Sequence, residues 1–199
     1  MILENLDKMF PDADCELDYS NPFELLIAVV LSAQTTDKGV NKVTPLLFSK
    51  YGTPEKMMNA NLEDIENIIR PLGLYKNKAK NIINLSKDLV LKFDGNVPNN
   101  RIDLESLSGV GRKTCNVILA TIFNVPAIAV DTHVSRVAKR LKLADQDDDV
   151  LEIEKKLMAI IPKEKWGKFH HQMIFLGRYI CHSKNPSCNK CLFNGYCRQ

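Results

Sequence analysis

The sequence predicts an all-α protein, and two observations lead to that prediction. Apolar residues recur at intervals of three and four along most of the chain, the spacing that gives a helix one apolar face. One example is the set Phe23, Leu26, Ile27 and Val30. The alternation of apolar and polar residues that marks a half-buried strand is confined to the short stretch 127–130. We therefore expect roughly ten short helices with short connections.

Residues that start and end helices divide this sequence into elements. Asn21-Pro22 and Thr53-Pro54 predict helix starts, because Asn and Thr cap helices and proline is tolerated in the first turn. Pro71-Leu-Gly73 predicts a helix end, and Asp94-Gly95 closes a helix that begins near residue 77. Later helices are expected to end at Leu107 and to span 112–123 and 132–141.

Length and composition are those of an ordinary globular protein. The chain has 199 residues, 45% of them hydrophobic and 26% charged, which is enough to bury a core in one domain or two small lobes. The longest apolar run, 25–31, is too short to span a bilayer, and the first residues lack the pattern of a secretory signal. We expect a cytoplasmic protein that does not enter a membrane.

The net charge of +3 is small but unevenly distributed. Six Lys or Arg and no Asp or Glu lie in 165–199, and seven basic residues face three acidic ones in 101–142. Acidic residues gather instead at 145–154 and 63–66. One positive face could follow the phosphates of a nucleic acid, although ordinary surfaces also carry charge clusters of this kind.

Four of the six cysteines are close together: Cys181, Cys188, Cys191 and Cys197. In a reducing cytosol, this grouping favours metal ligation over disulfides. Structural zinc sites usually use two close pairs of ligands, and only Cys188 and Cys191 form such a pair here. The wider spacing favours an iron–sulfur cluster, with zinc as the alternative. Four neighbouring cations would offset the negative charge of a thiolate cluster and could then reach phosphates: Lys184, Lys190, Arg178 and Arg198.

A glycine pair separates two predicted helices near residue 110. Gly109 and Gly111 permit positive φ and leave N–H groups uncovered at the positive end of the second helix. Such a turn can hold one backbone phosphate, although the same pattern also makes a plain helix–helix turn. Lys113 lies in the first helical turn, where a cation is disfavoured and the neutral amine of a nucleophile is favoured. A phosphate-contacting surface lysine is the alternative.

Asp131 is expected to return to the level of Lys113. The helix 112–123 advances about 18 Å, and the extended stretch to residue 130 can return by about 20 Å. Asp131 then begins the next helix as its N-cap, which could be its whole role. An amine at a positive helix end with a carboxylate in reach would form a nucleophile and its general base.

Together these motifs resemble the endonuclease III family of helix–hairpin–helix DNA glycosylases. The resemblance covers nearly the whole chain and is carried by 22–37, 73–79, 107–114, 130–133 and the four cysteines. It implies a two-lobed fold with a six-helix barrel domain at 15–125, whose helix–hairpin–helix motif lies near 104–123. An iron–sulfur cluster domain would combine 1–14 with 126–199 and carry the cluster loop 181–197.

The resemblance also implies the roles of individual residues. Lys113 would be the Schiff-base lysine, Asp131 its catalytic partner, and the four cysteines the ligands of one [4Fe–4S] cluster per chain that takes no part in the reaction. Gln34 would address the orphaned base, and Leu74 would replace lost stacking as an apolar wedge. The other expected DNA contacts are Gly109, Gly111, Arg112, Thr132, His133, Lys184 and Lys190.

The implied reaction is the removal of an oxidised or ring-saturated pyrimidine from damaged double-stranded DNA. Lys113 would attack the deoxyribose, and β-elimination would nick the strand. We expect a monomer that acts in the cytoplasm, with chromosomal DNA. Two alternatives are a monofunctional adenine glycosylase, a group that generally lacks the lysine, and a non-catalytic iron–sulfur DNA-binding redox sensor. The departures from the family pattern are Ser108 for Pro, Cys115 for Ala and Leu176 for His.

Overall fold

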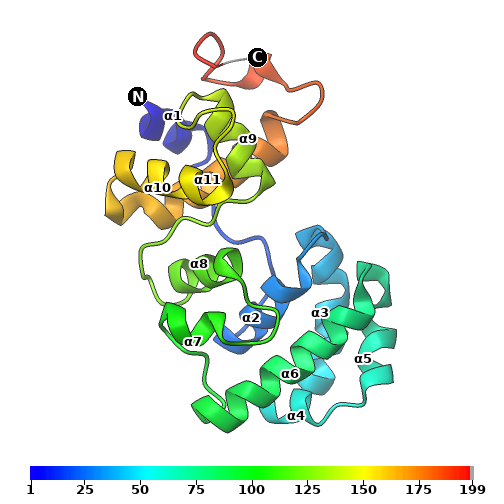
Figure 1. The fold of residues 1–199 in the computed structure, drawn as a ribbon. Coiled ribbons are helices and arrows are strands. Elements are labelled where there is room, and N and C mark those ends of the chain that lie inside the picture. Colours follow the sequence, from blue (N-terminus) through cyan, green and yellow to red (C-terminus); the bar gives the residue numbers. More distant parts are fainter. Residues whose placement is uncertain (198–199) are drawn as a thin grey trace. The chain divides into compact units, whose positions relative to one another are not determined.

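The structure is a computed structural model that describes residues 1–197 as a chain of helices (Figure 1). Within these residues there are eleven α-helices, three 3-10 helices and one π-helix, and no β-strand. The predicted all-α class is confirmed. Residues 127–130, the one stretch with strand-like alternation, form a buried connection without strand pairing. None of the helices within residues 1–197 is long and apolar enough to cross a lipid bilayer.

The chain divides into two compact units. Unit 2 is the continuous segment Glu16–Phe123, and unit 1 combines Met1–Cys15 with the chain from Asn124 onward. The helices of unit 2 are α2 (Pro22–Leu31), α3 (Asp37–Tyr51), α4 (Pro54–Met58), α5 (Leu62–Ile69), α6 (Tyr75–Phe93), α7 (Arg101–Glu105) and α8 (Arg112–Thr121). Those of unit 1 are α1 (Ile2–Met9), α9 (Thr132–Arg140), α10 (Val150–Ile160) and α11 (Trp166–Phe175).

Helix α2 is the centre of unit 2. Phe23 and every residue from Leu25 to Leu31 are buried. Because a helix that is apolar on all sides must be enclosed by other elements, α3, α6 and α8 pack around it. The start predicted at Asn21-Pro22 is confirmed, since Asn21 Oδ1 accepts a hydrogen bond from the backbone N–H of Glu24 (3.0 Å).

The other predicted helix ends in unit 2 lie within two residues of the observed ones. Helix α6 begins at Tyr75 rather than near residue 77, and α8 ends at Thr121 rather than at residue 123. Helix α6 stops where Asp94 and Gly95 both adopt positive φ, 51° and 75°. This left-handed turn gives the last carbonyls new hydrogen-bond partners and ends the helix, as the sequence predicts.

Helix α11 is the centre of unit 1. The buried core around it includes Phe169, Met173, Val134, Val137 and Leu157. The side-chain amide of Gln172 donates hydrogen bonds to Oδ1 of Asp7 (2.9 Å) and to the carbonyl oxygen of Phe10 (3.2 Å). These bonds fasten the segment of α1 to α11, so residues from the two ends of the sequence share one core.

A π-helix, Leu176–Ile180, continues α11 and leads into the cysteine-rich tail. Its last turn is closed by a hydrogen bond from the N–H of Cys181 to the carbonyl oxygen of Leu176 (2.6 Å). Gly177 lies directly against α9, because a Cβ built there would be 2.8 Å from Cβ of His133. Only a glycine allows this approach, so the tail starts in contact with the first turn of α9.

Candidate active site

Helices α7 and α8 form a helix–hairpin–helix whose turn depends on Gly109. Its φ is +80°, and a Cβ built there would lie 3.1 Å from Cβ of Asn81 on α6. Both the positive φ and the short distance to Asn81 disfavour any side chain at position 109. Gly111 has an extended φ of −101° and serves as the N-cap of α8. Both glycines were expected to offer positive φ, and only Gly109 uses it.

Lys113 is the second residue of α8 and is exposed, as is Arg112 before it. Because the N-cap residue is Gly111, no capping side chain covers the first N–H groups of this helix. Uncovered N–H donors, the positive helix end and the amine of Lys113 thus share the amino-terminal end of α8. This arrangement can bind an anionic backbone and place an amine beside it.

Asp131 is the N-cap of α9, as predicted. Its Oδ1 accepts a hydrogen bond from the backbone N–H of Val134 (2.8 Å), which fixes the orientation of the half-buried carboxylate. Asp131 belongs to unit 1 and Lys113 to unit 2. The groove that the two were expected to share stays a prediction.

Thr132 and His133 follow Asp131 in the first turn of α9. Thr132 is exposed, as a DNA contact must be, whereas His133 is half-buried. Nδ1 of His133 lies 3.3 Å from Nη2 of Arg136. Its backbone is also pressed against Gly177, so its position depends on the tail as well as on α9.

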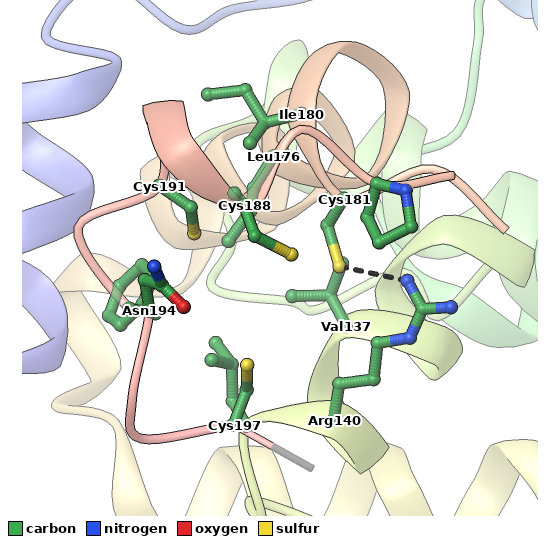
Figure 2. A pocket seen from close by; sticks show the side chains of 12 residues that line it. Val137, Arg140, Leu176, Ile180, Cys181, Cys188, Cys191, Asn194 and Cys197 are labelled. Atoms are coloured by element: carbon green, nitrogen blue, oxygen red, sulfur yellow. Dashed lines mark hydrogen bonds between the residues drawn. The ribbon is translucent and has the colours of Figure 1, made fainter. Parts of the chain in front are cut away.

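The four tail cysteines line one cavity of about 200 Å³ in unit 1. Cys181 follows the π-helix, Cys188 begins a 3-10 turn (Cys188–Lys190), Cys191 follows that turn, and Cys197 closes the loop. Figure 2 shows their sulfur atoms arranged around a common space. Apolar side chains complete the wall, among them Val137, Leu176 and Phe193. The four cysteines that the sequence places close together thus line one cavity, and their binding of a metal centre stays a prediction.

The chemistry of this cavity is that of partly buried sulfur. Burial raises the pKa of the Cys191 thiol, and the neighbouring cysteines act in the same direction. In the part of the chain that the structure describes, no three His, Cys, Asp or Glu side chains converge on the position of a single metal ion.

The comparisons with known proteins agree with one another. Residues 27–163 match the family model of the HhH-GPD superfamily base excision DNA repair proteins. Endonuclease III of Bacillus subtilis (strain 168) is 52% identical over 197 residues, 99% of this chain and 90% of the relative. Endonuclease III of Escherichia coli (strain K12) is 44% identical over 98% of this chain and 92% of the relative. This chain belongs to the endonuclease III family.

A solved structure extends this family relationship to the fold. A trapped covalent intermediate between an endonuclease III and DNA, with an estranged adenine, matches with a TM-score of 0.95 at 57% identity. The match covers 98% of this chain and 92% of the other. The helix–hairpin–helix glycosylase fold and the role in base excision repair that the sequence predicted are thereby confirmed.

This member of the endonuclease III family holds its cysteine loop with two arginines of α9. Nη1 of Arg140 donates hydrogen bonds to Sγ of Cys181 (3.2 Å) and to the carbonyl oxygen of His182 (2.7 Å). Arg136 donates from Nε to the carbonyl oxygen of Cys181 (3.1 Å) and from Nη2 to that of Gly177 (2.7 Å). Our sequence analysis missed both residues. Their spacing of four, on one face of a helix, was the available signal.

Of the cations that we expected to compensate the cysteines, Lys184 and Lys190 are exposed on the loop, Arg178 is half-buried in the π-helix, and Arg198 lies outside the described residues. Arg140 contacts a cysteine sulfur directly. Two departures from the endonuclease III pattern, Cys115 and Leu176, are almost completely buried, and Leu176 also lines the cysteine cavity. Both are thus packing positions.

Gln34 and Leu74 lie on two loops of unit 2, before α3 and before α6. Both are exposed and both have positive φ, 55° for Gln34 and 49° for Leu74. The side chain of Leu74 is an apolar group that is 58% exposed. Non-glycine residues rarely adopt this conformation, and it is concentrated at functional sites. The sequence alone did not predict the strained backbone at these two positions.

Proposed function

We propose that Lys113 and Asp131 perform the glycosylase and lyase chemistry of this base excision repair enzyme, on oxidised or ring-saturated pyrimidines. The observation that carries the proposal is the position of Lys113. Its amine lies at the exposed, positive end of α8, immediately after the Gly109 turn. A flipped nucleotide whose phosphate is bound by that turn would bring its sugar to the amine.

The proposed reaction begins with a proton transfer. The Asp131 carboxylate accepts a proton from Nζ of Lys113, and the neutral amine attacks C1′ of the damaged nucleotide. The bond between C1′ and the base nitrogen breaks, and the base leaves with the electron pair and takes up a proton. The attached nitrogen then gives up one of its two protons, O4′ takes up that proton, and the C1′–O4′ bond breaks. The sugar ring is thereby opened, and a protonated imine joins Lys113 and C1′.

The imine makes strand cleavage possible. It withdraws electrons from C2′, so that a proton can be removed from that carbon. The C3′–O bond then breaks and the 3′ phosphate leaves, which nicks the strand by β-elimination. Water releases the sugar fragment from Lys113, and the free enzyme is regenerated. Each step uses only groups of the protein, the DNA and water.

The DNA contacts follow from the same arrangement. The turn at Gly109, Gly111 and Arg112 would bind a backbone phosphate, with Thr132, His133, Lys184 and Lys190 as further contacts. Gln34 and Leu74 would enter the duplex at the place of the flipped base. The substrate is damaged double-stranded DNA, which places the enzyme with the chromosomal DNA in the cytoplasm. One chain carries every proposed group, so we expect a monomer.

We infer that the four cysteines hold one [4Fe–4S] cluster. A cavity surrounded by four thiols fits a group whose irons occupy separate corners better than it fits one ion. The hydrogen bond from Arg140 to Cys181 places a positive charge beside one of the proposed ligands. When bound, the cluster would cross-link the tail and supply no reacting group. In this assignment unit 1 is the cluster domain and unit 2 the helical barrel domain.

Borohydride trapping tests the proposed nucleophile. The chain is incubated with a duplex that contains an abasic site, the imine is reduced, and the linked peptide is identified by mass spectrometry. The peptide is expected to contain Lys113, and Lys113→Gln should abolish both trapping and strand cleavage while DNA binding survives. Lys155→Gln, at an exposed position of α10, is the matched control. Trapping that persists in Lys113→Gln would overturn the proposal in favour of another amine.

The same assays on the wild-type chain separate the alternatives. A monofunctional glycosylase would release adenine without trapping, and a redox sensor would bind DNA without releasing a base.

A further inference from the structure

Lys78 is buried in α6, where a lysine is unexpected. Only 4% of its surface is exposed, and burial lowers the pKa of its amine below the ordinary 10.5. Its Nζ donates hydrogen bonds to Oγ1 of Thr35 (2.7 Å) and to the carbonyl oxygen of Leu72 (3.0 Å). Both partners are neutral, so these bonds place the amine without forming an ion pair. A lysine so deeply buried cannot reach a DNA phosphate, which indicates a role inside the protein.

The partners of Lys78 are also bonded to each other. Oγ1 of Thr35 donates a hydrogen bond to the carbonyl oxygen of Leu72 (2.7 Å). The three residues therefore form a closed triangle that joins two loops of unit 2. One is the loop from α2 to α3, and the other is the connection from α5 to α6, in which Leu72 ends a 3-10 helix (Arg70–Leu72).

The two joined loops carry the two residues expected to enter the duplex. Thr35 directly follows Gln34, and Leu72 is followed by Gly73 and Leu74. Gly73 has a φ of +61° and a ψ of 155°, a conformation almost restricted to glycine. Gln34 and Leu74 have positive φ as well. Such strained residues keep their conformation only where the surrounding structure holds them, and the triangle fixes a chain neighbour of each: Thr35 next to Gln34, and Leu72 two residues before Leu74.

We propose that Lys78 and Thr35 are positioning residues that hold Gln34 and Leu74 at a fixed separation, ready to enter the duplex together. This inference rests on the proposed function, in which those two side chains replace the flipped base. Neither positioning residue needs to touch DNA. Their effect is to reduce the reorganisation that the loops would otherwise undergo on binding.

The test compares four variants on two substrates. Thr35→Val removes the hydroxyl at constant shape, Thr35→Ser keeps it, and Lys78→Met removes the amine but keeps the stem. The matched control is Ser86→Ala, which removes a completely buried hydrogen bond (2.7 Å, to the carbonyl oxygen of Ile82) from the same helix without touching either loop. One substrate is a duplex with a paired, ring-saturated thymine, and the other holds this lesion in a short unpaired bubble.

Thr35→Val and Lys78→Met are expected to lower kcat/KM on the paired duplex by about tenfold or more, because small misplacements of positioning groups cost that much. Activity on the bubble, where the base is already unstacked, should fall much less. Thr35→Ser should recover most of the loss. Equal losses on both substrates, or losses no larger than that of Ser86→Ala, would overturn the proposal.

A binding measurement keeps the test decisive if Lys78→Met does not fold. A duplex with 2-aminopurine opposite an abasic-site analogue reports unstacking by its fluorescence, and Thr35→Val should give a smaller increase than the wild type. If Thr35→Val gives the same fluorescence increase as an active wild type, the inference is contradicted and the proposed function is not. A wild-type chain that neither cleaves the lesion nor forms the imine would instead overturn the proposed function, and this inference with it.

Discussion

Arg140 and Cys181 are joined by a hydrogen bond from the guanidinium to the sulfur, across 41 positions of sequence. Because Nη1 of Arg140 also binds the carbonyl oxygen of His182, the cation is fixed beside the first of the four cysteines (Figure 2). A fixed positive charge stabilises a thiolate and therefore the metal–sulfur bond that the thiolate forms.

Replacing Arg140 with Met should accordingly weaken retention of the proposed cluster. We expect the variant to lose iron to a chelator about tenfold faster than the wild type, the size of effect that partners of metal ligands usually have. Iron content and visible absorbance over time measure the loss. Lys139→Met is the control, because the amine of Lys139 binds the carbonyl oxygen of Gln146 instead. Equal rates in both variants would show that the bond to Cys181 has no such effect.

Asp131→Asn separates the two roles of this residue. Asparagine caps helices as well as aspartate does, so the free energy of unfolding should change by only a few tenths of a kcal/mol. Strand cleavage should nevertheless fall by about 10²-fold or more, because the general base is lost. Urea unfolding and single-turnover cleavage measure the two quantities. Full activity in Asp131→Asn would reduce Asp131 to a helix cap.

The two hairpin glycines should respond differently to alanine. Gly109→Ala places a side chain at a φ of +80° and 3.1 Å from Asn81, so it should destabilise the protein by about 1–2 kcal/mol and weaken DNA binding. Gly111→Ala meets no atom within 4 Å and an ordinary φ, so its effect on stability should be a fraction of that. Thermal unfolding and DNA titrations check both, and similar losses of stability would contradict this account.

The buried amine of Lys78 predicts a pH dependence of stability. Burial lowers its pKa below 10.5, so between the folded and unfolded pKa values the unfolded chain binds more protons than the folded chain. Stability contributed at this site must therefore rise as the pH rises through that interval and be lost as the pH falls through the folded-state pKa. Urea midpoints of the wild type, relative to those of Lys78→Met, should increase up to about pH 10.5. Parallel curves would show that Lys78 does not titrate in this way.

Local signals account for what the sequence predicted. The α2 start at Asn21 and the α9 cap at Asp131 each depend on a side chain and a backbone group three residues apart. The α6 end depends on the positive φ of the neighbouring residues Asp94 and Gly95. Such interactions are encoded in short segments, so a sequence pattern is enough to find them. The four cysteines were found for the same reason, because they are neighbours in the chain.

Interactions between distant segments could not be predicted in this way. Lys78 and Thr35 are 43 positions apart, and their contact is set by how α6 packs against α2. The periodic pattern marks Lys78 only as a position near an apolar face. The π-helix before Cys181 escaped prediction too, since no local residue pattern distinguishes it from the last turn of α11.

Arg136 and Arg140 of α9 bind the backbone of the cysteine-rich tail, and Arg140 also binds the sulfur of Cys181. The carbonyl oxygens of Gly177, Cys181, His182 and Ser183 all accept hydrogen bonds from Arg136 or Arg140. These bonds to backbone carbonyl oxygens do not depend on a metal bound by the thiols. A chain from which iron has been removed should therefore keep the start of its tail in place, which limited proteolysis can verify. A protein that has lost its proposed cluster could then be reloaded with iron and sulfide, without refolding or resynthesis of the polypeptide.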